Sequence, residues 1–408
     1  MKVKIILRQA TPALIGYYKP DKIDEAWYLR PSSLKGVWRW FMRALVAGAL
    51  YDLGYLHGCR GRSIVLKPTR SEVMAVSYIV GKVFGMGYAD PEGKESEVSR
   101  IRMLVKPLKS PRVDKASNIL GESLQRLRLL SRSRKGIDPF CFCDGEFKVT
   151  LLVSKRQGAE EVAIKALPLA LTLSGLGKGA RRALGSFDVL DIEMEHLSLP
   201  ERLPKLLNEL HESVKEEIEQ RSNRLEKFGL KRSAEAGRVD LPPMPLLSKA
   251  MPARHPASEI YLARGPRLRW QQLHNFFLRS YRCQVLYGNS KAQDTLRRKL
   301  EAWVLGLPRE QRKQNTGYRA KGVARRASPI LVAYHTKEHI YGDGAYITSF
   351  LSLDWPSQIE WRDSIRRQRT CQLIPVNQGR VVSALSDAID ELKRYLSRCG
   401  ARVHRIWP

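Results

Sequence analysis

The chain has 408 residues, a length that allows two domains, each with a hydrophobic core of its own. It carries 71 Lys and Arg against 41 Asp and Glu, a formal net charge of +30. An excess of this size indicates a polyanionic partner, either a nucleic acid or an anionic membrane surface. The sequence holds no long apolar run and no signal-peptide pattern. We therefore expect a cytoplasmic protein with no membrane partner, and favour a nucleic acid.

The N-terminal residues predict a strand followed by a helix. Residues 2–8 alternate as a strand does, and Pro31 after Arg30, with Ser32 and Ser33, is typical of a helix start. In this helix four apolar residues share one face and three cations spaced four apart form a stripe beside it: Leu34, Trp38, Phe41 and Leu45, and Lys35, Arg39 and Arg43. We expect one side of the helix to pack and the neighbouring side to offer positive charge to solvent or to a ligand.

The rest of the first half predicts one sheet with a second helix. Residues 100–135 are strongly basic and interrupted by prolines, so we expect an irregular insertion there. Residues 147–153 are typical of a strand, 160–174 of an apolar helix, and 189–194 of a further strand. This order fits a ferredoxin-like fold, the architecture of an RNA-recognition motif. The loop before the last strand would then cross the sheet face on which RNA lies.

That loop, residues 173–188, holds four glycines, three cations and no acid before its last residue: Gly175, Gly177, Gly179 and Gly185, with Lys178, Arg181 and Arg182. Glycines let backbone N–H groups approach a ligand, and the cations match phosphates. Arg182 stands where a dinucleotide fingerprint needs its third glycine, and Gly179 stands where a P-loop needs Ser or Thr. The loop therefore favours a polyanion over a bound nucleotide.

The second half predicts a further domain of strands and helices. Residues 203–228 are expected to form one long charged helix, and the prolines within 242–252 mark a linker. Beyond the linker we expect a strand at 259–264, helices at 270–282 and 295–305, strands at 330–335 and 346–353, a helix at 382–396 and a strand at 401–406. A basic tract, 309–326, precedes the strand at 330–335 and contains Arg309, Arg325 and Arg326.

Three stretches, in this order, resemble the RAMP superfamily, the RNA-binding subunits of CRISPR effector complexes. They are Arg-Pro-Ser-Ser-Leu-Lys-Gly with Trp-Arg-Trp-Phe at 30–41, the glycine-rich loop, and Gly-Leu-Pro at 306–308 followed by Arg-Arg-Ala-Ser-Pro at 325–329. Together they are similar to the large two-domain subunit of the type III-B, or Cmr, complex. Residues 100–135 and 203–252 match no motif of that family.

The resemblance implies an α+β fold with two tandem ferredoxin-like domains. We expect the first domain at 1–198, a helical segment and linker at 199–252, and the second domain at 253–408. The implied role is a non-catalytic one in antiviral defence, without cofactor or metal. The implied partners are guide RNA near its 3′ end, single-stranded target RNA and other RAMP subunits.

From the residues and the resemblance together we predict which side chains contact RNA. Backbone amides of the glycine loop and the surrounding cations would hold phosphates, without reading the base sequence. The predicted RNA-binding residues are Arg30, Ser33, Lys35, Arg39, Arg43, Gly175, Gly177, Lys178, Gly179, Arg181, Arg182, Arg309, Arg325 and Arg326. Bases would stack on an exposed aromatic residue, which the sequence does not identify.

Catalytic alternatives rest on fewer residues. The main one is a metal-independent RAMP endoribonuclease that processes CRISPR RNA with His57 as general acid or base. His335 and His339 have the spacing of a zinc peptidase motif, but they lie between strand-like runs rather than on a helix. A general RNA-binding protein, such as a ribosomal one, fits the charge but explains none of the three motifs.

Other metal sites have weaker support. The six cysteines are scattered, which predicts reduced thiols, and a zinc site from His57, Cys59, Cys141 and Cys143 lacks a ligand-spacing motif. Asp191, Glu193 and Glu195 alternate as the solvent face of a strand does, and no other acid converges on them in the sequence pattern.

Overall fold

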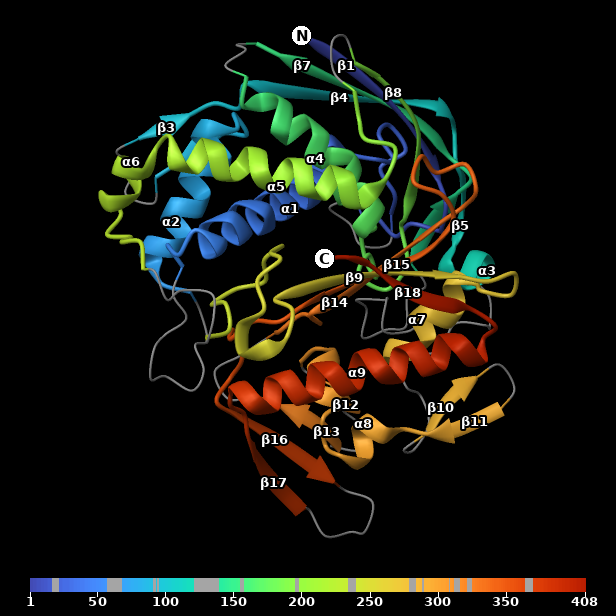
Figure 1. The fold of residues 1–408 in the computed structure, drawn as a ribbon. Helices are drawn as coiled ribbons and strands as arrows, with labels where there is room; N and C mark the ends of the chain where they lie inside the picture. The colour runs from blue at the N-terminus through green and yellow to red at the C-terminus, as the bar shows by residue number, and fades with distance from the viewer. Residues whose placement is uncertain are drawn as a thin grey trace.

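The computed structural model stacks two sheets and two sets of helices into four layers (Figure 1). It describes residues 1–16, 22–56, 68–90, 93, 95–120, 139–154, 158–194, 198–233, 240–278, 284–287, 290–307, 309–311, 316–320, 325–363 and 370–408. Within these ranges no helix is both long and apolar enough to cross a membrane.

The first sheet contains β1 (Lys2–Gln9), β4 (Ile101–Lys109), β7 (Glu146–Val153) and β8 (Phe187–Met194). Its order is β4-β7-β1-β8 and every pairing is antiparallel. Helices α1 (Pro31–Asp52) and α4 (Glu160–Leu173) connect these strands and cover the inner face of the sheet. The connectivity β1-α1-β4-β7-α4-β8 is the predicted ferredoxin-like one.

Helix α1 is the centre of the first core, as its apolar periodicity predicts. Leu34, Trp38, Phe41 and Leu45 are all buried. The indole of Trp38 donates to the carbonyl of Ala163 on α4 at 2.6 Å, which fixes the two helices against each other. At Gly48 a Cβ would lie 1.6 Å from the carbonyl oxygen of Leu247, so only glycine allows this approach. The predicted linker is therefore packed onto α1.

Helix α5 (Leu203–Glu219) completes the layer beneath the first sheet, beside α1 and α4. Its leucines enter the same core as α1, while its acidic residues face outward. The single helix predicted for 203–228 is wrong, because the chain leaves the helix at Arg221 (φ −120°) and forms a separate short α6 (Ser222–Glu226). The short α2 (Arg70–Tyr78) continues into a π-helical turn, Ile79–Val83, beside α1.

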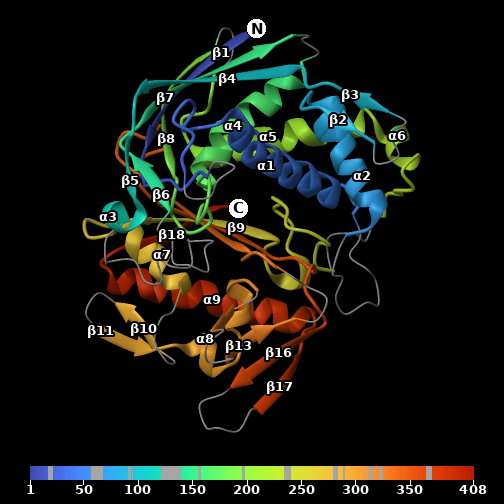
Figure 2. The ribbon, with the colours of Figure 1, turned by 180° about the vertical axis from the view of Figure 1, so that it is seen from behind.

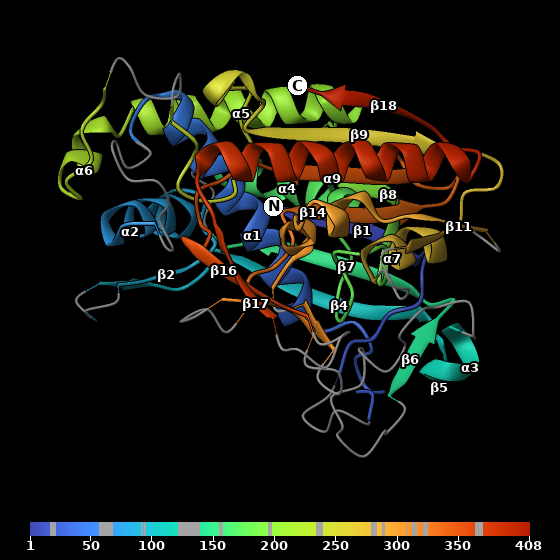
Figure 3. The same cartoon turned by 90° about the horizontal axis from the view of Figure 1, so that it is seen from below.

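The second sheet contains β9 (Ser258–Arg264), β14 (Ile330–His335), β15 (Gly344–Phe350) and β18 (Arg402–Trp407). Its order, β14-β15-β9-β18, is again ferredoxin-like, with α7 (Trp270–Leu278) and α9 (Gln378–Arg398) as the helices. Figure 3 shows α9 running along this sheet. The predicted fold class, α+β with two tandem ferredoxin-like domains, is confirmed.

The second sheet is buried on both faces. Alternate residues enter different cores: Ile260, Leu262 and Tyr346 join the core built around α1, whereas Tyr261, Ala263 and Ile347 join the core beneath α9 and α7. A sheet that packs on both sides needs apolar residues at most positions, and β9, β14 and β15 have them, whereas the edge strand β18 is largely exposed. The core around α1 is consequently built from both halves of the chain, and the domain boundaries predicted from sequence remain a proposal.

Shorter elements extend from the two domains. They are β2 (Tyr88–Ala89) with β3 (Ser96–Glu97), β5 (Arg112–Lys115) with β6 (Phe140–Cys143), α3 (Ala116–Leu120), β10 (Gln284–Tyr287) with β11 (Ser290–Gln293), α8 (Thr295–Arg298), 3-10 turns at Pro252–Arg254 and Ala302–Leu305, and a four-stranded sheet of β12 (Arg309–Gln311), β13 (Thr316–Arg319), β16 (Gln358–Asp363) and β17 (Thr370–Pro375). Seen from behind, β5, β6 and α3 reach from the first sheet towards α7 (Figure 2).

Two further sequence expectations are wrong. Residues 101–109 are not an irregular insertion but the strand β4, whose Ile101, Met103 and Val105 face the core and alternate with exposed residues. The helix predicted for 295–305 is interrupted by Leu300, whose φ is +55°. Both errors have the same cause, since tertiary packing overrides the local pattern. The C-terminal part of the helix predicted for 270–282 lies outside the described residues.

Candidate nucleic-acid interface

The glycine-rich loop is folded tightly onto itself and onto the segment that follows β1. A Cβ at Gly175 would lie 2.1 Å from the carbonyl oxygen of Leu184, and one at Gly185 would lie 2.0 Å from that of Leu176. Gly177 has a φ of +85°, and a Cβ there would lie 2.6 Å from the carbonyl oxygen of Leu14. These glycines are thus required by the packing of the loop itself.

The amides of this loop are largely used inside the protein, which changes the predicted mode of binding. Amides that donate to protein carbonyls at 3.0 Å or less are those of Gly175, Leu176, Lys178, Arg182, Ala183 and Gly185. A phosphate would have to break these hydrogen bonds to reach the amides. Binding of phosphate therefore falls to the side chains of the loop.

The loop packs against the second domain and does not cross the open face of the first sheet, so that expectation is wrong. The amide of Val332 on β14 donates to the carbonyl of Arg181 at 3.2 Å, and the amide of Ala183 donates to the carbonyl of Val332 at 2.8 Å. Further on, the amide of Tyr334 donates to Oγ of Ser186 at 3.1 Å. We call this contact of residues 172–189 with residues 328–341 the seam.

The open face of the first sheet lacks the aromatic residues of an RNA-recognition motif. The residues that point outward from β1, β4 and β7 in the described strands are cations, aliphatic residues, Thr150 and Glu146. Leu104 and Leu152 are among the more exposed hydrophobic residues of the chain. Without a ring on this face, bases have no stacking platform there.

Four predicted RNA-binding arginines converge at the seam, and we call Arg181, Arg182, Arg325 and Arg326 the arginine cluster. The guanidinium of Arg181 lies 5.3 Å from the ring centre of Trp40 on α1, and its Nη1 donates to the carbonyl of Ser328 at 3.3 Å. The guanidinium of Arg182 lies 5.9 Å from the ring centre of Phe277 on α7. Arg325 is exposed.

The arginine cluster carries more positive charge than the protein around it balances. In the described part of the chain, the acid that faces it is Asp354, which already accepts from Nη2 of Arg326 at 2.9 Å. Burial and then repulsion from neighbouring arginines lower the pKa of Arg181 and of Arg182. An anion placed between these side chains would relieve that repulsion.

Arg326 itself has a structural role. Its side chain is 9% exposed and lies 4.1 Å from the ring centre of Trp355, while its Nε donates to the carbonyl of Asp354 at 3.0 Å. A guanidinium held in this way has little surface left for a phosphate. We therefore leave Arg326 out of the proposed contacts and keep Arg325.

Arg309 joins the same region through Phe277. Its Nη2 donates to the carbonyl of Phe277 at 2.6 Å and its Nη1 to that of Leu305 at 3.4 Å. His274, one turn before Phe277 on α7, is 1% exposed, and its Nδ1 lies 3.2 Å from the carbonyl oxygen of Arg182. Burial, and secondly the charge of Arg182, lower the pKa of His274 to about 4, so this histidine is neutral at neutral pH.

Two cations of α1, Lys35 and Arg39, are hydrogen-bonded to backbone carbonyls, whereas Arg43 is exposed to solvent. Lys35 donates to the carbonyl of Ile101 at 3.4 Å and Arg39 to that of Met86, so both tie α1 to the segment that leads into β4. Burial, and then the charge of Arg39, lower the pKa of Lys35. Arg43 is exposed, whereas Arg30 and Ser33 are half-buried, with Arg30 Nε 4.0 Å from Asp24. Only Trp40 of α1 joins this helix to the arginine cluster through a described ring contact.

The structure identifies an exposed aromatic residue that the sequence did not. Trp27 is 45% exposed in the turn before α1, whereas Trp38, Trp303, Trp355 and Trp407 are buried. Its neighbour Tyr28 packs against Phe142, and Phe142 pairs with Ala13, next to the residue on which Gly177 rests. Trp27 therefore stands on the same side of the first domain as the glycine loop.

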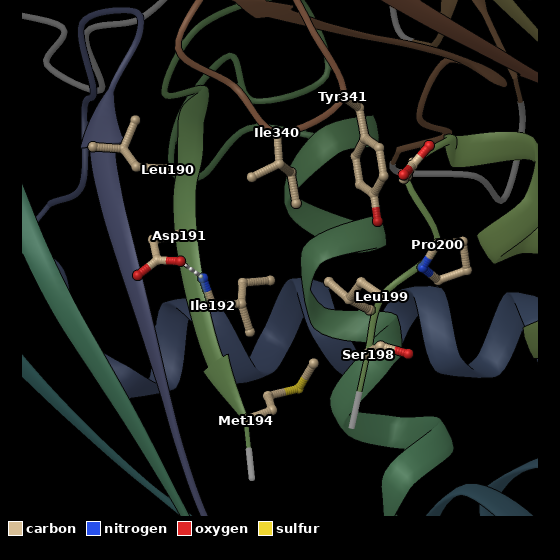
Figure 4. A pocket seen from close by; sticks show the side chains of 10 residues that line it. Leu190, Asp191, Ile192, Met194, Ser198, Leu199, Pro200, Ile340 and Tyr341 are labelled. Carbon is tan, nitrogen blue, oxygen red and sulfur yellow. Dashed lines mark hydrogen bonds between the residues drawn. The ribbon is translucent and has the colours of Figure 1, made fainter. Parts of the chain in front are cut away.

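A pocket of about 280 Å³ beside β8 does not suit RNA phosphates (Figure 4). Its lining is mainly apolar, with Leu190, Ile192 and Ile340 on its walls and the hydroxyl of Tyr341 directed into it. Two acids, Asp191 and Glu201, also line it, and Asp191 accepts from the amide of Ile192 at 2.8 Å. Glu193 is paired with Lys4, and Glu195 lies outside the described residues, so the nuclease alternative based on these acids gains no support.

The two histidines of the apparent zinc motif are brought together, but not as metal ligands. His335 ends β14 and His339 lies in the following turn, and with Asp188 they form a buried group of possible ligands. Their rings are stacked, with centres 4.0 Å apart and planes at 19°. Ring nitrogens bind a metal within the ring plane, and two nearly parallel planes do not meet at one ion. His57 and Cys59 lie outside the described residues.

Comparison with known proteins agrees with this architecture. The sequence model of the RAMP superfamily matches residues 8–188, the part that contains the first sheet, α1 and the glycine loop. The predicted resemblance to that superfamily is thereby confirmed for the first domain. No curated protein sequence matches the chain.

Solved structures share the fold of both domains. The apo crystal structure of Cmr1 from Pyrococcus furiosus has a TM-score of 0.51 at 16% identity, covering 100% of this chain and 99% of that chain. A subunit in the cryo-EM structure of the type III-B Cmr-beta complex, bound to cognate target RNA and AMPPnP in the presence of ssDNA, has a TM-score of 0.50 at 11% identity, with coverages of 96% and 99%. At these identities the likeness shows the shared fold.

Proposed function

We propose that this chain is an RNA-binding subunit of a type III-B CRISPR effector complex, and that it holds RNA phosphates at the seam. The observation that carries the proposal is the arginine cluster, in which side chains from both domains lie close together and Asp354 is the acid of the described chain that faces Arg181 and Arg326. The RAMP match and the shared fold with Cmr1 support the same assignment.

The proposed contacts are side chains that reach the surface of the seam. Lys178, Arg181, Arg182 and Arg325 would each take part of the phosphate charge, with Arg309 beside them. Trp27 would supply a ring for one unpaired base. Because the cations recognise phosphates, binding would depend on salt and not on base sequence.

The resemblance also supplies the partners. We propose guide RNA near its 3′ end, single-stranded target RNA and other RAMP subunits as the molecules that this chain contacts. Target RNA is named for the similar Cmr-beta complex, and its binding here is part of the proposal.

A binding role is favoured over an endoribonuclease by the histidines around the loop. His274, His335 and His339 are all buried and hydrogen-bonded in the described structure, so none of them is placed as a general acid or base for RNA. His57, the residue on which that alternative rests, lies outside the described residues. We propose that the subunit is non-catalytic.

The test is binding of labelled single-stranded RNA across a salt series. The variant is Lys178→Ala with Arg325→Ala, and the matched control is Arg394→Ala with Arg402→Ala, two exposed arginines of α9 and β18. We expect the slope of log affinity against log salt to fall by about 0.7 for each phosphate that the variant no longer binds, and to stay unchanged in the control. RNA recovered intact after incubation with and without Mg²⁺ is expected for a non-catalytic subunit. Equal salt slopes in the variant and the control would show that RNA binds at another site. Cleaved RNA would favour the endoribonuclease.

A further inference from the structure

The seam contains a buried polar cluster for which RNA binding gives no account. Asp188 and Thr172 come from the first domain, at the start of β8 and near the end of α4. His335, Thr336 and His339 come from the second, at the end of β14 and in the turn after it. Asp188, His335 and Thr172 are at most 1% exposed and His339 is 3% exposed. Polar groups removed from water in this way must satisfy each other.

Both ring nitrogens of His335 face hydrogen-bond acceptors. Nδ1 lies 2.8 Å from Oδ1 of Asp188, and Nε2 lies 3.0 Å from the carbonyl oxygen of Thr172. A neutral imidazole has one N–H, so it would leave one lone pair facing an oxygen. The arrangement is satisfied when both nitrogens of His335 carry protons.

The carboxylate of Asp188 is arranged as an anion. Besides the ring of His335, it accepts from Oγ1 of Thr336 at 2.5 Å and from the amide of Thr336 at 3.2 and 3.3 Å. Several donors that converge on one carboxylate stabilise its charged form. Asp188 and His335 are therefore a buried ion pair that joins the two domains.

His339, in contrast to His335, is a neutral ring with a single N–H. Its Nδ1 accepts from the amide of Val189 at 3.0 Å, so the proton lies on Nε2, which is 3.0 Å from Oγ1 of Thr172. The hydroxyl of Thr172 in turn donates to the carbonyl of Pro168 at 2.8 Å. Burial, and secondly the charge of His335, lower the pKa of His339 well below its ordinary value. A neutral ring thus stacks on the imidazolium.

The cluster lies directly beside the glycine loop. Asp188 is the last residue of that stretch. The loop contacts β14 first at Val332, through Arg181 and Ala183, and then at Tyr334, through Ser186. The next residue of β14 is His335, which contacts Asp188. The ring of Tyr346 on β15 closes one side, 5.6 Å from the ring of His335. A change in this pair would shift the segment that carries Arg181 and Arg182.

We propose that the Asp188–His335 ion pair is a positioning element that locks the glycine loop onto the second domain and so fixes the arginine cluster. The lock exists in the form in which His335 carries two ring protons and His339 carries one. The effect of this ion pair on RNA binding rests on the proposed function. Its role in holding the glycine loop on the second domain does not depend on that function.

The protonation states are tested on the unaltered protein by NMR of nitrogen-labelled histidine. At neutral pH we expect His335 to have two protonated ring nitrogens and His339 to have a proton on Nε2 alone. Assignment uses His335→Asn and His339→Gln, each of which removes one set of signals. A neutral ring at His335 would overturn the proposal, whatever the RNA measurements give.

The positioning role is tested by hydrogen exchange at fixed pH in Asp188→Asn, His335→Asn and the double variant, with the exposed His404→Asn as control. Each single variant leaves one charge buried without its partner, and we expect exchange of the Ala183 and Val189 amides to accelerate about tenfold or more. The double variant should exchange less than the combined single effects predict, because it buries no charge. Unchanged exchange at Ala183 would overturn the lock.

RNA affinity in the same variants separates the two proposals. We expect the single variants to bind RNA more weakly and the control to bind as the unaltered protein does. Faster exchange with unchanged RNA affinity would retain the lock and place RNA away from the seam. Unchanged exchange with weaker RNA binding would overturn the lock and retain the RNA site.

Discussion

Acidification should weaken the seam through His274, and the structure gives the direction and the size. The ring of His274 is 1% exposed on α7, with its Nδ1 3.2 Å from the carbonyl oxygen of Arg182. Burial and the charge of Arg182 lower its pKa from 6.5 to about 4. Between about pH 6.5 and pH 4, His274 therefore binds a proton in the unfolded chain but stays neutral in the folded protein.

The sign follows from linkage. A histidine whose folded pKa is depressed contributes stability that is full above the unfolded pKa of about 6.5 and is lost as the pH falls towards the folded pKa of about 4. At 1.36 kcal/mol per pKa unit, the loss over this window is about 3 kcal/mol. His339, whose pKa is also lowered, adds a loss of the same sign.

The assay is urea unfolding of the unaltered protein and of His274→Asn at about pH 7 and about pH 4. Asparagine keeps an N–H donor near the position of Nδ1 and does not titrate. Acidification lowers the unfolding free energy of both proteins, and we expect the decrease to be up to about 3 kcal/mol smaller in the variant, which lacks His274. The carboxylates titrate in the same way in both proteins, so they do not contribute to this difference. The exposed His404→Asn serves as control. The same pH dependence in His274→Asn as in the unaltered protein would refute the argument.

Three further predictions follow from single contacts. Asp354→Ala leaves the buried guanidinium of Arg326 unpaired and should lower the unfolding free energy by about 3–5 kcal/mol in urea unfolding; a loss below about 1 kcal/mol would contradict this. Gly185→Ala places a Cβ 2.0 Å from a carbonyl oxygen, so we expect a lower melting temperature and faster exchange in the loop, whereas an unchanged melting temperature would show that the loop adapts freely. Trp27→Ala should weaken RNA binding by about 1–3 kcal/mol without changing urea unfolding, and equal RNA affinity would exclude stacking on Trp27.

Much of the fold could be predicted from the sequence because its strongest signals are local. The apolar positions of α1 and the alternation along β1 and β7 are confirmed as buried faces. The strand β4 escapes prediction because its solvent-facing positions hold leucines as well as cations, which hides the alternation of its buried residues. A period of two is difficult to recognise when apolar residues occupy positions on both faces of a strand.

The site could be predicted in part, because residue types indicate a ligand but not which residues meet. The sequence points to the glycine loop and to Arg325, which the fold brings into one region. It does not show that Asp354 neutralises Arg326, nor that loop amides bond to the second domain. Asp188 and His335 are also far apart along the chain, so their ion pair has no local signal.

The central claim is that RNA lies at the seam, in contact with both domains. The most direct measurement is photocrosslinking of thiouridine-containing single-stranded RNA to the intact chain, followed by mass spectrometry of the crosslinked peptides. We predict crosslinks in the glycine loop and in residues 325–331, from the first and second domains respectively. Crosslinks confined to β4 and β7, on the open face of the first sheet, would contradict the account.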